Sequence, residues 1–299
     1  KDFILPIFVV EGENIKREIS SLKGNYHWSV DRLGELVKEL KETAVRSVII
    51  FGVPEHKDCK GTEAYNEDGI VQKAIRKLRE LDDELYIITD VCMCEYTDHG
   101  HCGILHGKSI DNDETLEYLG KIALSHAKAG AHMIAPSDMM DGRIGHIRKV
   151  LDDNGFKMTP IMSYAAKYAS GFYGPFREAA GSAPQFGDRK GYQMDPANSR
   201  EAMLEIEADI NEGADIIMVK PAMSYLDIVR EARNRYDVPL CVYNVSGEYA
   251  MVKSAGEAGL IDEKRVALEM LMSMKRAGAK MIMTYYAIEA ARWLKEDSN

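Results

Sequence analysis

Apolar and polar residues follow two patterns along this chain, which predict strands and helices in turn. Eight short apolar runs recur, separated by mixed segments, at residues 4–10, 45–53, 85–91, 132–138, 159–167, 216–222, 240–246 and 280–286. Runs that are apolar on both faces are typical of a parallel sheet buried under helices. We therefore expect such a sheet to form the centre of the protein.

Amphipathic stretches between these runs predict the helices. In residues 114–130 the apolar side chains fall on one helical face, at Leu116, Leu119, Ile122 and Ala123. A recurring Gly-Ala-x-apolar phrase marks the turn from a helix into the next strand, at Gly130, Gly213 and Gly278.

Strands and helices that alternate eight times over about 250 or more residues predict an α/β fold of the (β/α)8 barrel type, the TIM barrel. A doubly wound open sheet is the alternative, but no glycine-rich phosphate loop follows the first apolar run. The sequence contains no evident linker, so residues 1–299 are predicted to form a single domain.

Composition and charge exclude several functions. The chain is 45% hydrophobic and 29% charged, and its net charge of -10 repels nucleic-acid backbones. No apolar run is long enough to span a membrane, and no signal or transit segment opens the chain. Five cysteines, three of them close together, favour a reducing cytoplasm over a secreted disulfide framework. Because the chain begins at Lys1 and not at Met, we expect some N-terminal sequence to be missing.

Polar and ionisable residues follow most of the predicted strands. In a barrel, catalytic groups gather at the carboxyl ends of the strands. Here those ends carry Asp90, Ser137, Asp138, Lys167, Lys220, Ser246, Tyr285 and Tyr286. Strand ends are often polar because they meet solvent, but two lysines on adjacent strands need a further explanation.

Lys220 follows four apolar residues and precedes Pro221, so its amine is expected to lose hydration. Desolvation lowers the pKa of a lysine and frees the amine as a nucleophile, and a second ammonium from Lys167 would lower that pKa further. For either lysine alone, the alternative is a side chain that extends to solvent at the edge of the barrel without a catalytic role. Together the two lysines predict imine chemistry on a carbonyl substrate.

Residues 168–197, after the fifth predicted strand, show no clear helical or strand period. Loops of this length in compact domains are usually functional or disordered. This one carries aromatic and polar candidates, which are Tyr173, Phe176, Arg177, Arg189, Lys190 and Gln193. We predict an active-site lid whose arginines bind a substrate carboxylate; a solvated loop with incidental charges is the alternative.

Three cysteines follow the third predicted strand in a C-x-C-x7-C arrangement, at Cys92, Cys94 and Cys102. Thiolates favour zinc in a reducing cell, and three protein ligands leave a fourth position open, as a catalytic zinc requires. His99 or His101 would instead close the site. Reduced thiols without metal and a redox site remain as alternatives, whereas a disulfide between Cys92 and Cys94 would be strained.

Several segments resemble the porphobilinogen synthase (5-aminolevulinate dehydratase) family, in that family's order. They are DVCMCEYTDHGHCG, APSDMMDGRIGHIR, MSYAAKYASGFYGPFREAA, QFGDRKGYQMDPANSREA, MVKPAMSYLDIVRE, YNVSGEYAM and TYYA. The resemblance extends over residues 3–295 and is most specific at the cysteine and lysine segments. It implies a (β/α)8 barrel, in agreement with the strand count.

The resemblance implies that two molecules of 5-aminolevulinate condense to porphobilinogen with loss of two waters. Lys220 matches the lysine that forms a Schiff base with the first, or P-side, substrate molecule, and Lys167 the one that holds the second, A-side molecule. The three cysteines match catalytic zinc ligands of the zinc-type members. Asp90 and Ser137 match polar groups near the reacting amines.

The resemblance also assigns the substrate carboxylates. Ser246 and Tyr285 match groups that bind the P-side carboxylate, whereas Arg177, Arg189 and Gln193 match those around the A-side carboxylate. The aromatic residues that match the pocket lining beneath the lid are Tyr173 and Phe176.

Glu205 matches an allosteric magnesium ligand of many bacterial members, with an ordinary exposed helix glutamate as the alternative.

The family's N-terminal arm, which wraps a neighbouring barrel and helps to build a homo-octamer, does not appear in this sequence. Two other functions would account for part of this pattern. A class I aldolase shares the barrel and the imine but does not account for the second lysine or the cysteines. A zinc-binding or metal-storage protein does not account for two lysines at one barrel mouth.

Overall fold

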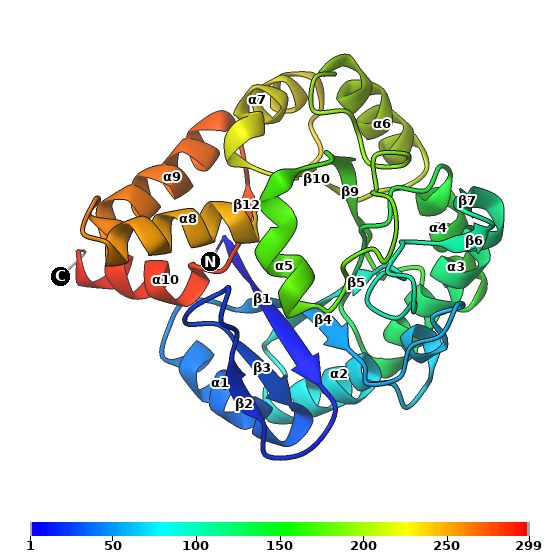
Figure 1. The fold of residues 1–299 in the computed structure, drawn as a ribbon, viewed down its shortest axis with the longest axis horizontal. Coiled ribbons are helices and arrows are strands. Elements are labelled where there is room, and N and C mark those ends of the chain that lie inside the picture. Colours follow the sequence, from blue (N-terminus) through cyan, green and yellow to red (C-terminus); the bar gives the residue numbers. More distant parts are fainter. Residues whose placement is uncertain (1, 298–299) are drawn as a thin grey trace.

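Eight parallel strands form the centre of the computed structural model, which describes residues 2–297 (Figure 1). Each strand lies within the apolar run that predicted it, except that β1 begins one residue earlier. They are β1 (Phe3–Val10), β4 (Ser47–Val53), β5 (Tyr86–Val91), β8 (Met133–Pro136), β9 (Met162–Lys167), β10 (Ile216–Lys220), β11 (Leu240–Asn244) and β12 (Met281–Thr284).

The strands follow one another around a ring in the order β8-β5-β4-β1-β12-β11-β10-β9. The ring closes between β8 and β9 through a single parallel bridge, Ile134↔Ile161, where Ile134 N donates to Pro160 O at 3.1 Å. The predicted (β/α)8 barrel is confirmed, and the open doubly wound sheet is excluded.

Helices surround the strands, as Figure 1 shows. They are α1 (Leu33–Lys41), α2 (Ile70–Leu81), α3 (Asn112–Ala129), α4 (Arg143–Asp153), α5 (Gly174–Ala179), α6 (Arg200–Asn211), α7 (Leu226–Arg235), α8 (Ser246–Glu257), α9 (Glu263–Ala277) and α10 (Ala287–Glu296). Gly130 and Gly278 end α3 and α9 at φ 106° and 127°, a region that favours glycine, and Gly213 follows the end of α6 at φ 105°.

Two short hairpins interrupt the βα repeat. Between β1 and α1, the strands β2 (Lys16–Glu18) and β3 (Tyr26–Ser29) pair antiparallel, and β3 also lies parallel to the end of β1. A second hairpin, β6 (Ile104–His106) with β7 (Ser109–Asp111), precedes α3. The sequence did not predict either hairpin, because strands of three or four mixed residues have no apolar run to reveal them.

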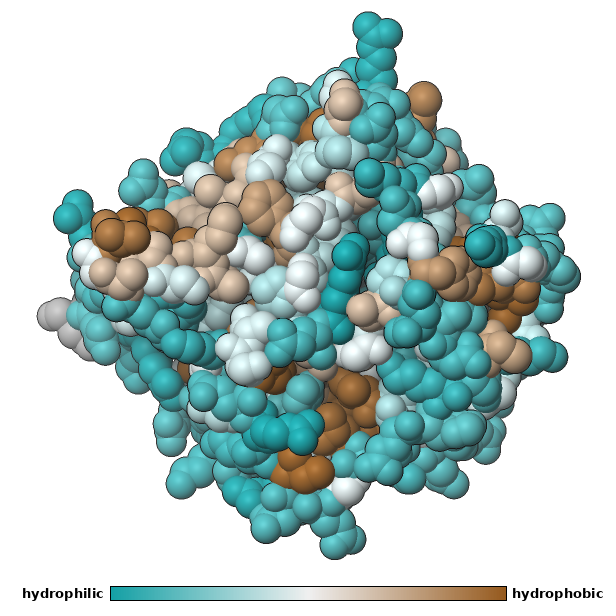
Figure 2. Space-filling view, in the orientation of Figure 1, coloured by the Kyte–Doolittle hydropathy of each residue, from teal (hydrophilic) through white to brown (hydrophobic). Residues whose placement is uncertain are grey.

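Large side chains fill the inside of the barrel, among them Phe8, Phe51, Tyr164, Met218 and Met283. On the outside, hydrophilic side chains cover most of the face on which α5 lies, and apolar side chains gather on its left side, towards α8 and α9, and below its centre (Figure 2). No helix among the described residues is long and apolar enough to cross a membrane.

Candidate active site

Two buried lysines lie side by side at the carboxyl ends of β9 and β10, where Lys167 and Lys220 are partners in the strand register. Their exposed fractions are 4% and 5%. The Lys220 amine lies 4.4–5.2 Å from the ring centres of four aromatic residues, which are Tyr164, Tyr173, Phe176 and Tyr243. Rings at this distance favour a cation but exclude water, so the lysine is desolvated as the sequence predicted.

The two amines differ in their protonation. Burial, and then the nearby Lys167 ammonium, lower the pKa of Lys220 to about 7. Burial also acts to lower the pKa of Lys167, but the cysteine cluster, with Cys102 first, outweighs it and raises that pKa. The Lys167 amine donates a hydrogen bond to the Ser137 carbonyl. Near neutral pH the Lys220 amine is therefore partly neutral and lies beside a Lys167 ammonium.

Asp90, on β5, adds a buried carboxyl group near the lysines. One of its oxygens, Oδ1, has no hydrogen-bond partner among the described residues. Burial, followed by repulsion from Glu95, raises the pKa of Asp90 to about 8, although Lys167 opposes this shift. A carboxyl group that is protonated near neutral pH can exchange a proton with a substrate.

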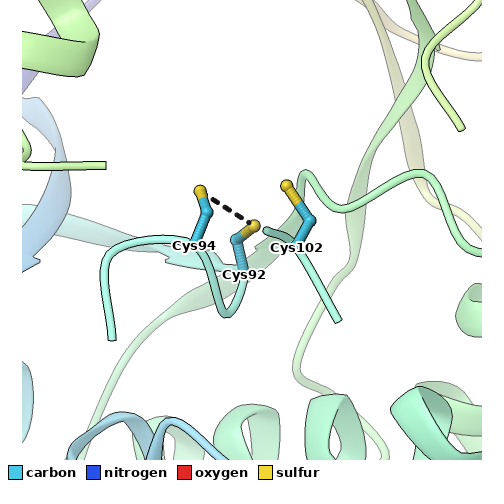
Figure 3. Close-up of side chains that lie close together, drawn as sticks. All are labelled: Cys92, Cys94 and Cys102. Carbon is cyan, nitrogen blue, oxygen red and sulfur yellow. Dashed lines mark hydrogen bonds between the residues drawn. The ribbon is translucent and has the colours of Figure 1, made fainter. Parts of the chain in front are cut away.

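The three predicted cysteines converge after β5, and Figure 3 shows their sulfur atoms pointing towards one region. The sulfurs of Cys92, Cys94 and Cys102 lie within 4.8 Å of one another, and all three residues are buried. Hydrogen bonds from the other two thiols lower the pKa of Cys102 well below its usual value. One thiolate stabilised by two thiols is a donor set suited to a soft metal ion.

The neighbouring histidines do not join the cluster of thiols. Both ring nitrogens of His101 have other contacts, with Tyr192 OH at 3.2 Å and Phe186 O at 3.1 Å. His99 Nδ1 accepts from the backbone N–H of His101. The three cysteines could therefore hold a metal ion without a histidine, and no disulfide links them.

The predicted lid does contain regular structure. Residues 171–173 form a 3₁₀ turn and lead into α5, which crosses the mouth of the barrel in Figure 1. The sequence did not reveal this helix because six residues, with Pro175 in the first turn, are too few to show a helical period.

A small cavity beneath the lid brings most of the predicted residues together. It is lined by Phe51, Cys94, Glu95, Ser137, Lys167, Tyr173, Phe176, Arg177, Arg189 and Lys220. Phe51 and Glu95 were not predicted as site residues. Nothing in the sequence distinguished Phe51 from other core residues, whereas Glu95 lies inside the cysteine segment and could have been considered.

Two arginines of the lid reach this cavity. Arg189 is buried and donates to Gly100 O at 2.8 Å and to Ser182 O. Arg177 is half-buried, and its pKa is lowered by burial and then by repulsion from Arg189. Gln193 is also buried, but it lines a different cavity and not this one, and neither atom of its side-chain amide has a partner among the described residues. These unpaired polar groups are suited to bind a carboxylate.

Neither Ser246 nor Tyr285 lines this cavity. Ser246 Oγ accepts from Phe176 N at 3.0 Å and donates to Phe172 O at 3.2 Å, so it contacts the lid directly. Tyr285 OH forms a hydrogen bond with Tyr243 OH at 2.9 Å. The Lys220 amine in turn lies over the ring of Tyr243.

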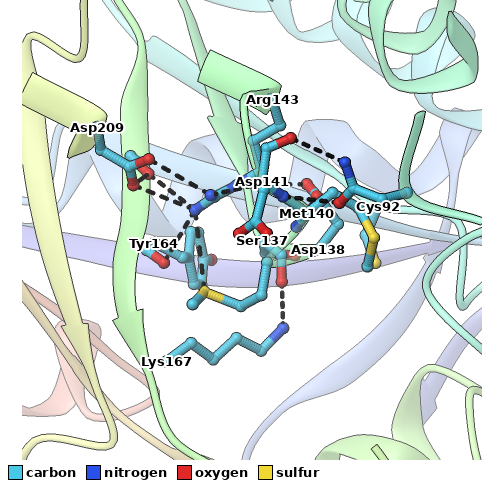
Figure 4. A network of polar contacts seen from close by, with 12 residues as sticks. Cys92, Ser137, Asp138, Met140, Asp141, Arg143, Tyr164, Lys167 and Asp209 are labelled. Carbon is cyan, nitrogen blue, oxygen red and sulfur yellow. Dashed lines mark hydrogen bonds and ion pairs between the residues drawn. The ribbon is translucent and has the colours of Figure 1, made fainter. Parts of the chain in front are cut away.

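A buried polar network supports the segment that contacts Lys167 (Figure 4). Arg143, 2% exposed, pairs with Asp209 at 3.2 Å and also donates to Ser163 Oγ and Tyr164 O. Asp138 lies 3.7 Å from the same guanidinium. The network joins α4, β9 and α6, and the sequence did not predict it because its members lie far apart along the chain.

Glu205 lies outside this site, on α6, beside a second cavity that Asp141 and Glu201 also line. Burial, and then repulsion from Asp141, raise the pKa of Glu205. Within residues 2–297, groups of three close ligand atoms occur at the cysteines and at His106, Asp111 and Glu114, and neither group includes Glu205.

Comparisons with known proteins agree with this geometry. A family model described as delta-aminolevulinic acid dehydratase matches residues 1–293. Proteins of that name from Bacillus subtilis and Staphylococcus aureus are 56% and 54% identical to the chain, over 99% and 98% of it and 91% of each relative.

Solved structures agree as well. A delta-aminolevulinic acid dehydratase (porphobilinogen synthase) from Toxoplasma gondii, in complex with its reaction product porphobilinogen, has a TM-score of 0.97 at 44% identity. The match covers 99% of this chain and 85% of that one. A dihydropteroate synthase from Xanthomonas albilineans, at 10% identity and a TM-score of 0.53 over 99% of this chain and 92% of that one, shares the fold alone.

Proposed function

The chain belongs to the delta-aminolevulinic acid dehydratase family, and from this premise we propose how its residues make porphobilinogen. The enzyme is a lyase of tetrapyrrole biosynthesis that condenses two 5-aminolevulinate molecules with loss of two waters. The observation that supports our mechanism most directly is the register pair of buried lysines, Lys167 and Lys220.

Lys220 is the first nucleophile in this proposal. With a pKa of about 7, much of its amine is neutral at physiological pH and adds to the keto carbonyl of the P-side molecule. Loss of water leaves an imine, which makes the neighbouring carbon acidic. The aromatic rings around Lys220 exclude bulk water and so protect the imine from hydrolysis.

Lys167 holds the A-side molecule through a second imine. Its hydrogen bond to the Ser137 carbonyl fixes the position of the amine beside Lys220. The raised pKa of Lys167 means that a proton must leave before it attacks, and Asp90 is a buried group suited to exchange protons there.

We assign the metal site to zinc, held by Cys92, Cys94 and Cys102, because three buried convergent thiols match the ligands that zinc prefers. When bound, zinc would supply Lewis-acid polarisation and a coordinated water of lowered pKa. The chain itself keeps the thiols together and places Arg189 and Lys167 near the Cys102 thiolate, whose pKa both cations lower.

The carboxylates of the two substrates bind on opposite sides in this proposal. Arg177, Arg189 and Gln193 bind the A-side carboxylate, which is supported by their unpaired polar atoms. Ser246 and Tyr285 bind the P-side carboxylate, and Tyr173 and Phe176 line the pocket below residues 168–197, which act as the lid.

Further features of the family extend the proposal. We propose that Glu205 contributes to an allosteric magnesium site in which water supplies the remaining ligands, since Mg²⁺ usually keeps several waters. We also propose that the enzyme works in the cytoplasm as a homo-octamer.

Incubation with 5-aminolevulinate followed by Ehrlich's reagent tests the reaction, because the reagent gives a coloured adduct with the pyrrole product. The wild-type chain should give colour, and Lys220→Ala should give none. Lys157→Ala, which changes an exposed lysine in the loop before β9, should match the wild type. A metal-loaded wild-type chain that forms no pyrrole would refute the function.

A further inference from the structure

The end of the lid helix α5 has an unusual set of hydrogen-bond donors. Three carbonyls are satisfied locally: Phe176 O accepts from the N–H of residue 180, Arg177 O from that of residue 182, and Glu178 O from that of residue 181. The carbonyls of Ala179 and Gly181 receive donors from outside the lid. A helix end requires such external partners when its own chain cannot supply them.

The first external donor is His27, on the β3 strand that the sequence did not predict. Its Nε2 lies 2.6 Å from Ala179 O, and since a carbonyl only accepts, this nitrogen must carry the proton. Burial lowers the pKa of His27, so the ring is neutral near physiological pH and has this single N–H to donate.

The second external donor is Lys57, in the loop after β4. Its Nζ lies 2.6 Å from Gly181 O. A cation next to the carbonyl end of a helix is also favoured by the helix dipole. His27 and Lys57 come from different parts of the barrel frame and meet the end of α5.

The position of α5 matters because of the residues that it carries. Phe176 lies 5.1 Å from the Lys220 amine and packs against Phe8 at 5.8 Å, and the Phe8 ring in turn contacts the His27 ring edge-on at 6.0 Å. Arg177, the next residue, lines the same cavity. Displacing the end of α5 would therefore move both residues away from the lysines.

We propose that His27 and Lys57 are positioning residues that dock the end of α5 onto the barrel and thereby place Phe176 and Arg177 over the lysine pair. The catalytic part of this inference rests on the proposed function, but the docking itself does not. Neither donor touches the reacting lysines, so both act through α5.

Hydrogen exchange on the substrate-free chain tests the docking. His27→Phe keeps the ring and removes the donor, and Lys57→Met keeps the aliphatic stem and removes the donor. Each should speed exchange of the amides of residues 180–182 by roughly fivefold, which corresponds to the loss of one hydrogen bond. His27→Gln and Lys57→Arg, which restore a donor, should return exchange towards the wild-type rate. His56→Phe, at an exposed histidine in the loop before Lys57, is the matched control and should leave exchange unchanged.

Kinetics separate docking from general destabilisation. The donor-free variants should raise the KM for 5-aminolevulinate by roughly two- to tenfold while kcat at saturation stays within twofold, because substrate binding completes the closure. A fall in kcat alone, or exchange at residues 180–182 unchanged in both variants, would overturn the proposal. Lys57 is only half-buried, so Lys57→Met provides both measurements if His27→Phe does not fold. A wild-type chain that makes no porphobilinogen would refute the function and leave the exchange result standing.

Discussion

At the scale of the residue, surroundings rather than residue type decide the chemistry. Lys167 and Lys220 are neighbours in one register, yet the pKa of one is raised and that of the other lowered. At Lys167 the attraction of the cysteine cluster, Cys102 first, outweighs burial, whereas at Lys220 burial among aromatic rings and repulsion from Lys167 dominate. Opposite shifts in a close pair assign a separate task to each group.

The neutral fraction of Lys220 should rise with pH through about 7, from about a tenth at pH 6 to about nine tenths at pH 8. Borohydride trapping of 5-aminolevulinate on the peptide containing Lys220 measures this fraction at each pH. Lys167→Met removes a positive charge that lowers this pKa, so the midpoint should move to higher pH. Lys167→Arg keeps the charge and is the control. A midpoint that both variants leave in place contradicts the electrostatic coupling.

The cysteine site should bind one zinc ion per chain. Cys102→Ser should lose zinc and turnover together, because it removes the sulfur whose thiolate the other two stabilise. Cys59→Ser is the matched control, since Cys59 is exposed and outside the cluster. Metal analysis before and after dialysis against a chelator checks the stoichiometry. Zinc retained by Cys102→Ser, or full activity without metal, speaks against the assignment.

At the scale of the element, buried polar groups hold the site to its supporting helices. Arg143 on α4 reaches Ser163 and Tyr164 on β9 and Asp209 on α6, so three elements share one guanidinium. Breaking a buried ion pair by removing one partner leaves the other charge uncompensated, which costs more than the pair itself contributes.

Arg143→Met should lower the free energy of unfolding by about 3–5 kcal/mol, because it leaves Asp209 and Asp138 buried without their cation. Urea unfolding followed by circular dichroism measures the change. Lys149→Met is the control on the same helix, where an exposed pair with Asp153 contributes little. Equal stability of the two variants would show that the network is not structural.

At the scale of the whole molecule, the strands of the barrel are not joined equally. β1 and β4 share six register pairs, from Leu5↔Val48 to Val10↔Val53, whereas β8 and β9 share one bridge. Lys167 is the last residue of β9 and Ser137 directly follows β8, so this seam leads up to their contact. Fewer ladder hydrogen bonds make local opening less costly.

The β8–β9 seam should therefore open more readily than the rest of the barrel. Native-state hydrogen exchange should show faster exchange at Ile134 than at Ile49 on β4. Both residues are fully buried, so a difference in exchange rate between them would not be caused by a difference in burial. Equal protection of the two amides would mean that the packed helices, and not the strand ladder, determine the opening.

Much of this protein could be predicted from its sequence because the signals are local. A strand buried on both faces must be apolar along its length, so each run, such as residues 216–222, marks one strand. The end of that run also places Lys220 at the mouth of the barrel. The three cysteines are close in sequence, so the sequence could predict that their sulfur atoms come together.

Tertiary structure alone decided the contacts between segments that are far apart in the sequence. His27 on a four-residue strand gives no sign that it meets Ala179, and Arg143 gives none that it meets Asp209. The opposite pKa shifts of Lys167 and Lys220 likewise depend on which rings and thiols the fold packs around each amine. Periodicity reports only whether a position is buried, whereas hydrogen bonds and electrostatic interactions depend on distances that the closed barrel sets.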